Sequence, residues 1–264
     1  MLPRARAAAE RAVALDPTLP EAHLALAHVH AESFAWADAE RELRQATSLG
    51  PNNAEIAFRV GFTHLTAGRA RDAIPAFDRA SGLDPFYGMA AAYAGWAKAL
   101  TGRNEEAVVD VRRALEIDPE NEAIGTIFSE VLVSTGHREE AVAFVRQRLA
   151  RPLTVRRQGF YGLVLAKGGA VDDARALIRV IEAGPDVPGR ISALSRLYLA
   201  VGDTTRALAA LEQVASGDGD LVLSQIFSSS NLDKIRGSQR FAAVLRRFNL
   251  DVERLTAPDG GRSR

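Results

Sequence analysis

The chain has 264 residues, of which 47% are hydrophobic and 25% charged, a composition typical of a soluble folded protein and not of a disordered one. Its 33 basic and 33 acidic residues give a formal charge of zero, which provides no general attraction to nucleic acid or to an anionic membrane. Because there is no cysteine, disulfides, zinc–thiolate sites and cysteine nucleophiles are excluded.

The chain start does not have the pattern of an export signal. Arg4 and Arg6 are charged, but no uninterrupted apolar core follows them. No stretch of about 18 apolar residues occurs, so we expect no membrane-spanning helix and a cytoplasmic protein. Alanine is in excess and lysine is rare compared with arginine, which indicates a GC-rich bacterial genome.

Four prolines divide the first half of the chain at a regular interval of 34 residues. Proline disfavours helix in the residue before it and cannot continue a helical hydrogen-bond ladder, so each one predicts the end of a helix. These stops are Pro17, Pro51, Pro85 and Pro119.

A second pattern recurs between these stops. A glycine is followed five residues later by alanine, seven residues further by another alanine, and then by the proline. The glycine suits the left-handed turn that ends one helix. The alanines, such as Ala73 and Ala107, suit a place where two helix backbones approach closely, opposite the small residues Ala27, Gly61 and Gly95 of the preceding helix. The unit is therefore predicted to be helix, tight turn, helix, turn.

This pattern resembles the tetratricopeptide repeat family, and the resemblance covers nearly the whole chain, about seven units at this spacing. It implies an all-α, right-handed superhelical solenoid of antiparallel helix pairs. Residues 18–119 form three well-matched units. Residues 120–219 form three degenerate units, in which Gly136 and Ala141 continue the pattern but Arg148 stands where the later alanine is expected.

The two ends of the chain differ from the repeats. Residues 1–17 match only the second helix of a unit, with Ala5 and Ala12 at the alanine spacing, and we expect this half repeat to lack its partner helix. Residues 220–250 are predicted to be a linker and a C-terminal capping helix, and residues 257–264 a disordered tail. The closing segment is similar to that of repeat arrays in bacterial signalling proteins and transcription regulators.

The candidate chemical motifs are better explained by structure than by catalysis. The five histidines show no convincing metal-ligand spacing, so we expect no metal and no cofactor. Acidic pairs such as Glu105-Glu106 fall where a second helix begins, and a carboxylate there complements the helix dipole. Lys167-Gly168-Gly169 lacks the spacing of a phosphate-binding loop, and Arg156-Arg157 is interpreted as a solvated pair. No catalytic residue is predicted.

The first helices of successive units are expected to line a concave groove, which is where partners of such arrays usually bind. The resemblance places one set of residues there: His28, Phe58, Arg59, Phe62, Met89, Tyr93 and Trp96. Aromatic residues and arginine often dominate interface energetics. The alternative is that some of these rings pack onto adjacent repeats. The groove is too apolar for the lysine-rich and asparagine-rich carboxylate clamp of chaperone-binding family members.

Two functions follow from this prediction. The first is a non-catalytic scaffold that binds a peptide or helix of another protein, with no direct contact to nucleic acid or membrane. The second is a regulatory arm of a bacterial kinase, cyclase or winged-helix regulator, either severed or encoded separately. The partners left open are therefore a protein or peptide, a second copy of the chain, and a fused or associated N-terminal effector domain.

Overall fold

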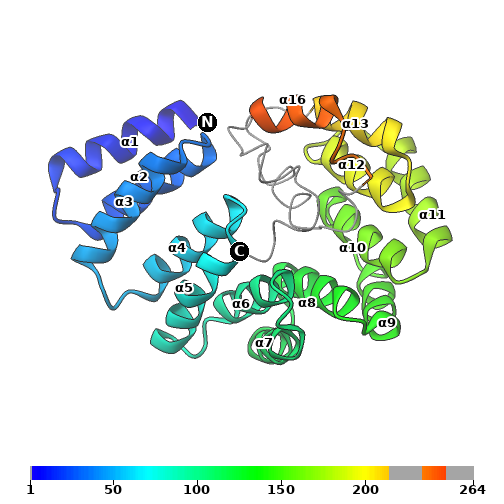
Figure 1. Ribbon diagram of the computed structural model, residues 1–264, viewed down its shortest axis with the longest axis horizontal. Helices are drawn as coiled ribbons and strands as arrows, with labels where there is room; N and C mark the ends of the chain where they lie inside the picture. The colour runs from blue at the N-terminus through cyan, green and yellow to red at the C-terminus, as the bar shows by residue number, and fades with distance from the viewer. Residues whose placement is uncertain (1, 214–233, 248–264) are drawn as a thin grey trace.

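The computed structural model describes residues 2–213 and 234–247 and contains only helices in that part of the chain. Helices pair in antiparallel fashion and the pairs stack into a curved array (Figure 1). The predicted all-α solenoid of antiparallel helix pairs is confirmed. No helix in the described ranges is both long and apolar enough to cross a membrane.

The first helices of the units lie on the inner side of the curve (Figure 1). Neighbouring inner helices contact one another, as α6 contacts α8 and α10 contacts α12. They are α2 (Pro20–Glu32), α4 (Ala54–Thr66), α6 (Gly88–Leu100), α8 (Glu122–Ser134), α10 (Val155–Lys167) and α12 (Arg190–Val201).

The second helices form the outer layer, and each packs against the inner helices beside it, as α7 packs between α6 and α8. They are α3 (Trp36–Leu49), α5 (Ala70–Leu83), α7 (Asn104–Ile117), α9 (Arg138–Leu149), α11 (Val171–Ala183) and α13 (Thr204–Gln213). Helix α1 (Leu2–Leu15) packs on α2, and α16 (Gln239–Arg247) packs on α13.

The turn glycines have the backbone conformation that the sequence pattern predicts. Their φ angles lie between +78° and +98°, a region that side chains with a Cβ rarely enter. The five are Gly68, Gly102, Gly136, Gly169 and Gly202. Because this conformation reverses the chain within about one turn, the second helix returns antiparallel to the first.

The predicted small residues lie in the tight contact between the two helices of a unit. Ala73, Ala107 and Ala141 are all 0% exposed. A Cβ on Gly95 would lie 2.8 Å from the carbonyl oxygen of Ala107, and one on Gly61 would lie 2.7 Å from the ring of Phe77. Real Cβ atoms do not come so close, so the contact requires these small residues.

The equivalent alanines of α1 are not covered in the same way. Ala5 is exposed and Ala12 is half-buried, whereas their equivalents in the later second helices are fully buried. Among the described helices, α1 packs mainly against α2. Of the predicted capping segment, residues 234–247 are described and contain α16, whose Phe241, Val244 and Leu245 are buried. The predicted disordered tail lies outside the described residues.

Arginine side chains bind the proline turns from the following second helix, a feature that the sequence analysis missed. Arg79 donates to the carbonyl oxygen of Pro51 at 2.5 Å, and Arg113 donates to that of Pro85 at 3.2 Å. Arg148, at the position of the missing alanine, donates in the same way to Pro119. It is accommodated because its guanidinium also stacks on Phe144, 5.0 Å from the ring centroid.

His23 connects the turn after α1 to α3. Its Nδ1 lies 2.8 Å from Oε2 of Glu42, and its Nε2 lies 3.0 Å from the carbonyl oxygen of Pro17. Both neighbours are acceptors, so both ring nitrogens must donate, as only the protonated imidazole does. Burial opposes this charge, but the hydrogen bonds outweigh it and raise the pKa of His23 above its ordinary value of 6.5.

We predict that Ala107→Leu lowers the free energy of unfolding by about 2–3 kcal/mol, because the added side chain has no space between α6 and α7. Urea unfolding measures this loss. Val109→Leu is the matched control on the same helix, since Val109 is 65% exposed. Equal unfolding midpoints for the two variants would contradict the close-approach explanation.

We predict that His23→Gln destabilises the protein by about 1–2 kcal/mol near pH 5.5, since a hydrogen bond to a charged group is lost. A histidine whose pKa is raised in the folded state contributes its full stabilisation below the unfolded-state pKa of 6.5. This stabilisation disappears as the pH rises through the folded-state pKa. The difference from wild type should therefore shrink near pH 9. His28→Gln, at an exposed histidine, is the control in the same urea titrations. A pH-independent loss for His23→Gln would exclude the charged form.

Candidate functional site

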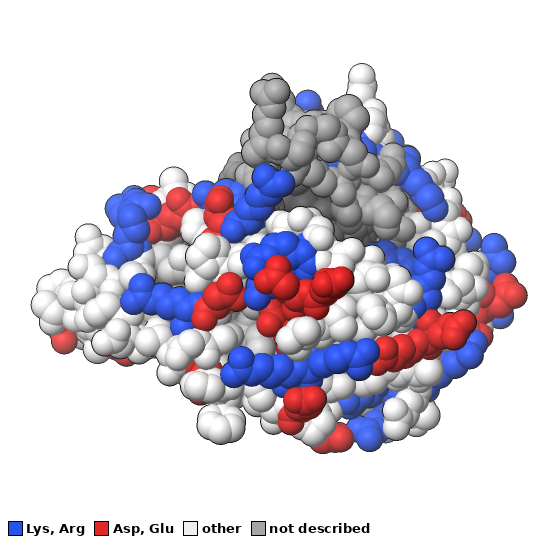
Figure 2. Space-filling view, turned by 60° about the horizontal axis from the view of Figure 1, so that its bottom comes forward, with Lys and Arg blue, Asp and Glu red and all other residues white. Residues whose placement is uncertain are grey.

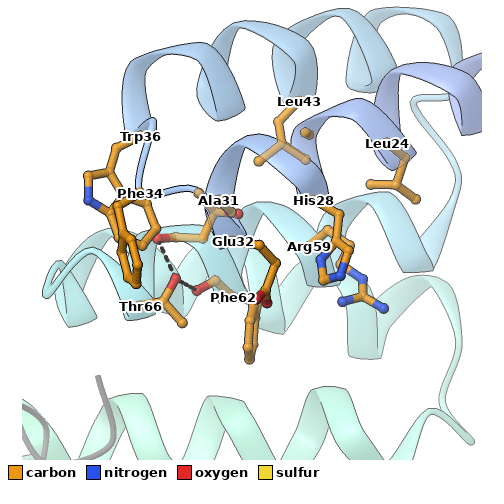
Figure 3. A pocket seen from close by; sticks show the side chains of 12 residues that line it. Leu24, His28, Ala31, Glu32, Phe34, Trp36, Leu43, Arg59, Phe62 and Thr66 are labelled. Carbon is orange, nitrogen blue, oxygen red and sulfur yellow. Dashed lines mark hydrogen bonds between the residues drawn. The ribbon is translucent and has the colours of Figure 1, made fainter. Parts of the chain in front are cut away.

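A hollow lies between α2 and α4 on the concave side of the array, beside the turn into α3 (Figure 3). We call it the hollow. It is lined by side chains of both inner helices, of the turn after α2 and of the outer helix α3, and most of them are apolar. They are Leu24, Ala27, His28, Ala31, Glu32, Phe34, Trp36, Leu43, Arg59, Phe62, Thr63 and Thr66. Three predicted groove residues, His28, Arg59 and Phe62, therefore meet here.

The polar end of the hollow is formed by His28 and Arg59, which lie next to each other in Figure 3. His28 is exposed on α2. Arg59 donates through Nε to Oε1 of Glu55 at 2.7 Å, one helical turn earlier, and its guanidinium lies 5.7 Å from the ring centroid of Phe58. These contacts hold the Arg59 side chain beside Glu55 and Phe58 at the edge of the hollow.

The opposite end of the hollow is closed by Phe34 and Trp36, whose rings meet edge to face with centroids 5.8 Å apart. Phe34 has a φ of 56°, the left-handed conformation that glycine adopts at the same turn position in the next units. A side chain with a Cβ is strained there. Burial of the ring, which is only 5% exposed, offsets that strain.

An aromatic cluster continues from the hollow along the array and is centred on Phe58. The Phe58 centroid lies 5.2 Å from that of Tyr87 and 5.6 Å from that of Phe77. The Phe62 and Tyr93 rings also contact it, at 6.0 and 5.5 Å. Phe58 itself is 5% exposed, so it belongs to the packed core and not to the inner surface. For Phe58, therefore, the alternative expectation holds: its ring packs onto the adjacent repeat.

The other predicted groove residues of α4 and α6 are half-buried and keep part of their surface toward solvent. They are Arg59, Phe62, Met89, Tyr93 and Trp96. Tyr93 connects the two helices, since its ring centroid lies 5.5 Å from that of Phe62 and 5.8 Å from that of Trp96. With the exposed His28, they form the candidate surface, a row of rings supported from below by Phe58.

Two aromatic residues of the cluster were missed in the sequence analysis. Phe77 comes from the outer helix α5, and Tyr87 precedes α6, so neither lies on the face expected to line the groove. The Tyr87 hydroxyl donates a hydrogen bond to Glu55. Burial raises the pKa of this phenol, and the hydrogen bond to Glu55 and its charge raise it further. The signal for Phe77 was present, because it faces the small residue Gly61.

Arg157 is also placed differently from its interpretation as a solvated residue. It lies in the first turn of the inner helix α10 and is half-buried, and its Nη1 donates to Oγ1 of Thr126 on α8 at 3.0 Å. Burial lowers the pKa of Arg157, and the adjacent Arg156 lowers it further. A single-sequence reading of two adjacent arginines cannot distinguish which of them turns inward.

The remaining predicted motifs occupy structural positions. The acidic pairs lie in the first turns of α7, α9 and α11. From these turns, Glu140 and Asp173 bind Arg112 and Arg146 of the preceding outer helices, at 2.8 and 2.9 Å. Figure 2 shows such basic and acidic side chains side by side over the surface.

No metal site is formed by three or more histidine, aspartate or glutamate side chains in the described ranges. Lys167, from the glycine-containing turn, binds Oε1 of Glu130 at 2.5 Å. The inner surface thus offers rings, a histidine and arginines. Such a surface is suited to burying apolar side chains of a ligand and to binding acceptor groups.

Known proteins share the repeat and its arrangement. Residues 63–122 match the family model described as tetratricopeptide repeat. No curated protein sequence matches the chain. The solved structure of PilF from Pseudomonas aeruginosa superposes with a TM-score of 0.52 at 16% identity, covering 80% of this chain and 97% of that one. At this identity the likeness shows a shared fold.

Two further solved structures are similar over shorter parts of the chain. MamA has 22% identity and a TM-score of 0.47, covering 54% of this chain and 83% of its own. YrrB, whose structure is described as a tetratricopeptide repeat protein with an unusual peptide-binding site, has 19% identity and a TM-score of 0.43, covering 69% and 95%.

We predict that Phe58→Ala lowers the free energy of unfolding by about 3–4 kcal/mol, because it leaves a cavity where four aromatic rings meet. Phe62→Ala should cost about half as much, since the Phe62 ring is already partly in solvent. Urea unfolding of the two variants, one helical turn apart, makes the comparison. A larger loss for Phe62→Ala would mean that the core and surface roles are reversed.

Proposed function

We propose that this tetratricopeptide repeat protein has a binding function. It acts as a non-catalytic scaffold that holds a segment of another protein against its concave face. The observation that carries the proposal is the row of half-buried rings, Phe62, Tyr93 and Trp96, next to the hollow. These rings are held in place by contacts with one another and with Phe58, so little side-chain entropy remains to be lost on binding.

The geometry favours a peptide or a single helix over a broad protein surface. The rings follow the inner helices α4 and α6, and the hollow between α2 and α4 continues the same surface. A narrow, curved strip of this kind fits an extended or helical segment, which inserts apolar side chains into it. Apolar burial with well-ordered aromatic anchors is the usual source of affinity at such sites.

The second candidate, a regulatory arm of a bacterial signalling enzyme or transcription regulator, places the same binding surface in a larger protein or complex. The observation that favours it is the uncovered alanine side of α1, where Ala5 is exposed although its equivalents in later units are fully buried. Such an arm would act in the cytoplasm, the location that we propose with this candidate. Sequencing of the adjacent genomic DNA tests it: an effector domain encoded in frame or in a neighbouring gene supports it, and a neighbourhood with no effector gene contradicts it.

We predict that the double variant Phe62→Ala, Trp96→Ala binds its peptide ligands at least about tenfold more weakly than wild type, the effect of losing one aromatic anchor or more. Ligands are first selected on the wild-type protein from a random peptide library, and their affinities are then measured by fluorescence anisotropy with synthetic peptides. Phe86→Ala is the matched control, because Phe86 is 83% exposed in the turn before α6 and lies outside the hollow.

Thermal unfolding must show that the double variant still folds. If the wild-type protein selects no peptide, or if the selected peptides bind the folded double variant and wild type equally, then the concave rings are not the binding surface.

A further inference from the structure

The position of Arg157 adds a chemical requirement to the concave surface. Its side chain starts on α10 and its Nη1 reaches Oγ1 of Thr126 on α8. Helix α8 in turn contacts α6, the helix that carries Tyr93 and Trp96. Since α6, α8 and α10 are successive inner helices (Figure 1), the Arg157–Thr126 contact lies on the same inner layer as the candidate rings.

Three other cations of this part of the array have carboxylate partners within the chain. Arg59 binds Glu55 at 2.7 Å, Lys167 binds Glu130 at 2.5 Å, and Arg148 binds Glu122 at 3.1 Å. In these pairs the charge of each cation is balanced without a ligand.

Arg157 differs, because its hydrogen bond is made to a neutral hydroxyl group. No carboxylate within residues 2–213 and 234–247 forms an ion pair with it at 4.0 Å or less. The nearby Glu122 already accepts hydrogen bonds from Arg148, at 3.1 Å, and from the hydroxyl of Tyr161, at 2.8 Å. Glu122 is therefore held by other partners.

A half-buried guanidinium without a carboxylate partner is an unfavourable arrangement. Arginine stays charged at neutral pH, and removing the charge from water costs free energy unless an opposite charge compensates it. A carboxylate brought to this position by a ligand would form a charge-assisted pair where water is partly excluded, and such pairs contribute to specificity.

We propose that Arg157 receives the carboxylate of an aspartate or glutamate side chain of the bound segment, whose large apolar side chains lie on Phe62, Tyr93 and Trp96. This inference rests on the proposed peptide-binding function and specifies the chemistry of the ligand. The partner segment is an internal stretch of a protein in which an acidic residue stands at a fixed spacing from apolar residues. Arg157 is then a specificity-determining residue.

The test uses the full chain and a random peptide library displayed with each peptide fused through its C-terminus, so that no free terminal carboxylate is present. Selection is performed on wild type and on Arg157→Gln. Wild type should enrich an acidic residue at a fixed distance from apolar residues, and Arg157→Gln should lose that preference while it still selects apolar peptides. Arg175→Gln, on the outer helix α11, removes the same charge elsewhere and is the control.

A synthetic peptide from the wild-type selection then allows a double-mutant cycle. Replacing the acidic residue of the peptide by its amide and replacing Arg157 by glutamine should each weaken binding about tenfold, and the two changes together should weaken it no more than either alone. Arg157→Lys should recover part of the affinity, because it keeps the charge but not the bidentate geometry.

The outcomes separate this inference from the function on which it rests. Peptides that need Phe62 and Trp96 but show no acidic preference, or additive losses in the cycle, overturn the role of Arg157 and leave the groove in place. A wild-type protein that selects no peptide contradicts the proposed function itself. Thermal unfolding of Arg157→Gln should match wild type or exceed it, since a costly buried charge is removed. A large loss of stability would instead assign Arg157 a structural role.

Discussion

The close approach of paired helix backbones at small residues is the constraint on which the rest of the structure depends. At Gly95, a single additional methyl group would overlap the facing helix, where it would lie 2.8 Å from the carbonyl oxygen of Ala107. Because the two helices of a unit are in such close contact, the unit acts as a rigid hairpin. Repetition of that hairpin every 34 residues then stacks inner helix on inner helix, and this produces the curved array and its concave face.

The same arrangement gives the outer and the inner surface of the array different side chains. Ion pairs connect successive outer helices, as in Arg112–Glu140 and Arg146–Asp173, and their exposed side chains keep the outer surface polar. Each such pair contributes less than about 1 kcal/mol, so stability comes mainly from the buried seam. The inner helices have fewer charges, and their aromatic side chains collect where α4 and α6 meet. The candidate surface is thus a consequence of how the hairpins stack.

The first unit departs from its neighbours where the hollow forms. Phe34 occupies the left-handed turn position at which Gly68 and Gly102 stand in the next units. Its ring closes one end of the hollow with Trp36, so a strained backbone position contributes directly to the candidate site. Strained backbone positions concentrate at functional sites, so the strain at Phe34 is an additional reason to regard the hollow as a candidate site.

The sequence by itself determined the unit, its length and its turns, because proline stops, glycine turns and alanine contacts act between residues that are close in the chain. It also identified the inner helices. Of the seven residues that it placed on their concave side, six retain solvent contact. Only the tertiary structure decided that Phe58 belongs to the core, since its burial depends on Phe77 and Tyr87 from neighbouring elements. Only the tertiary structure placed Arg157 against Thr126, 31 positions away, and not in solvent. A helix pattern specifies which side of a helix faces inward, whereas the depth of each side chain depends on the neighbours that stacking brings to it.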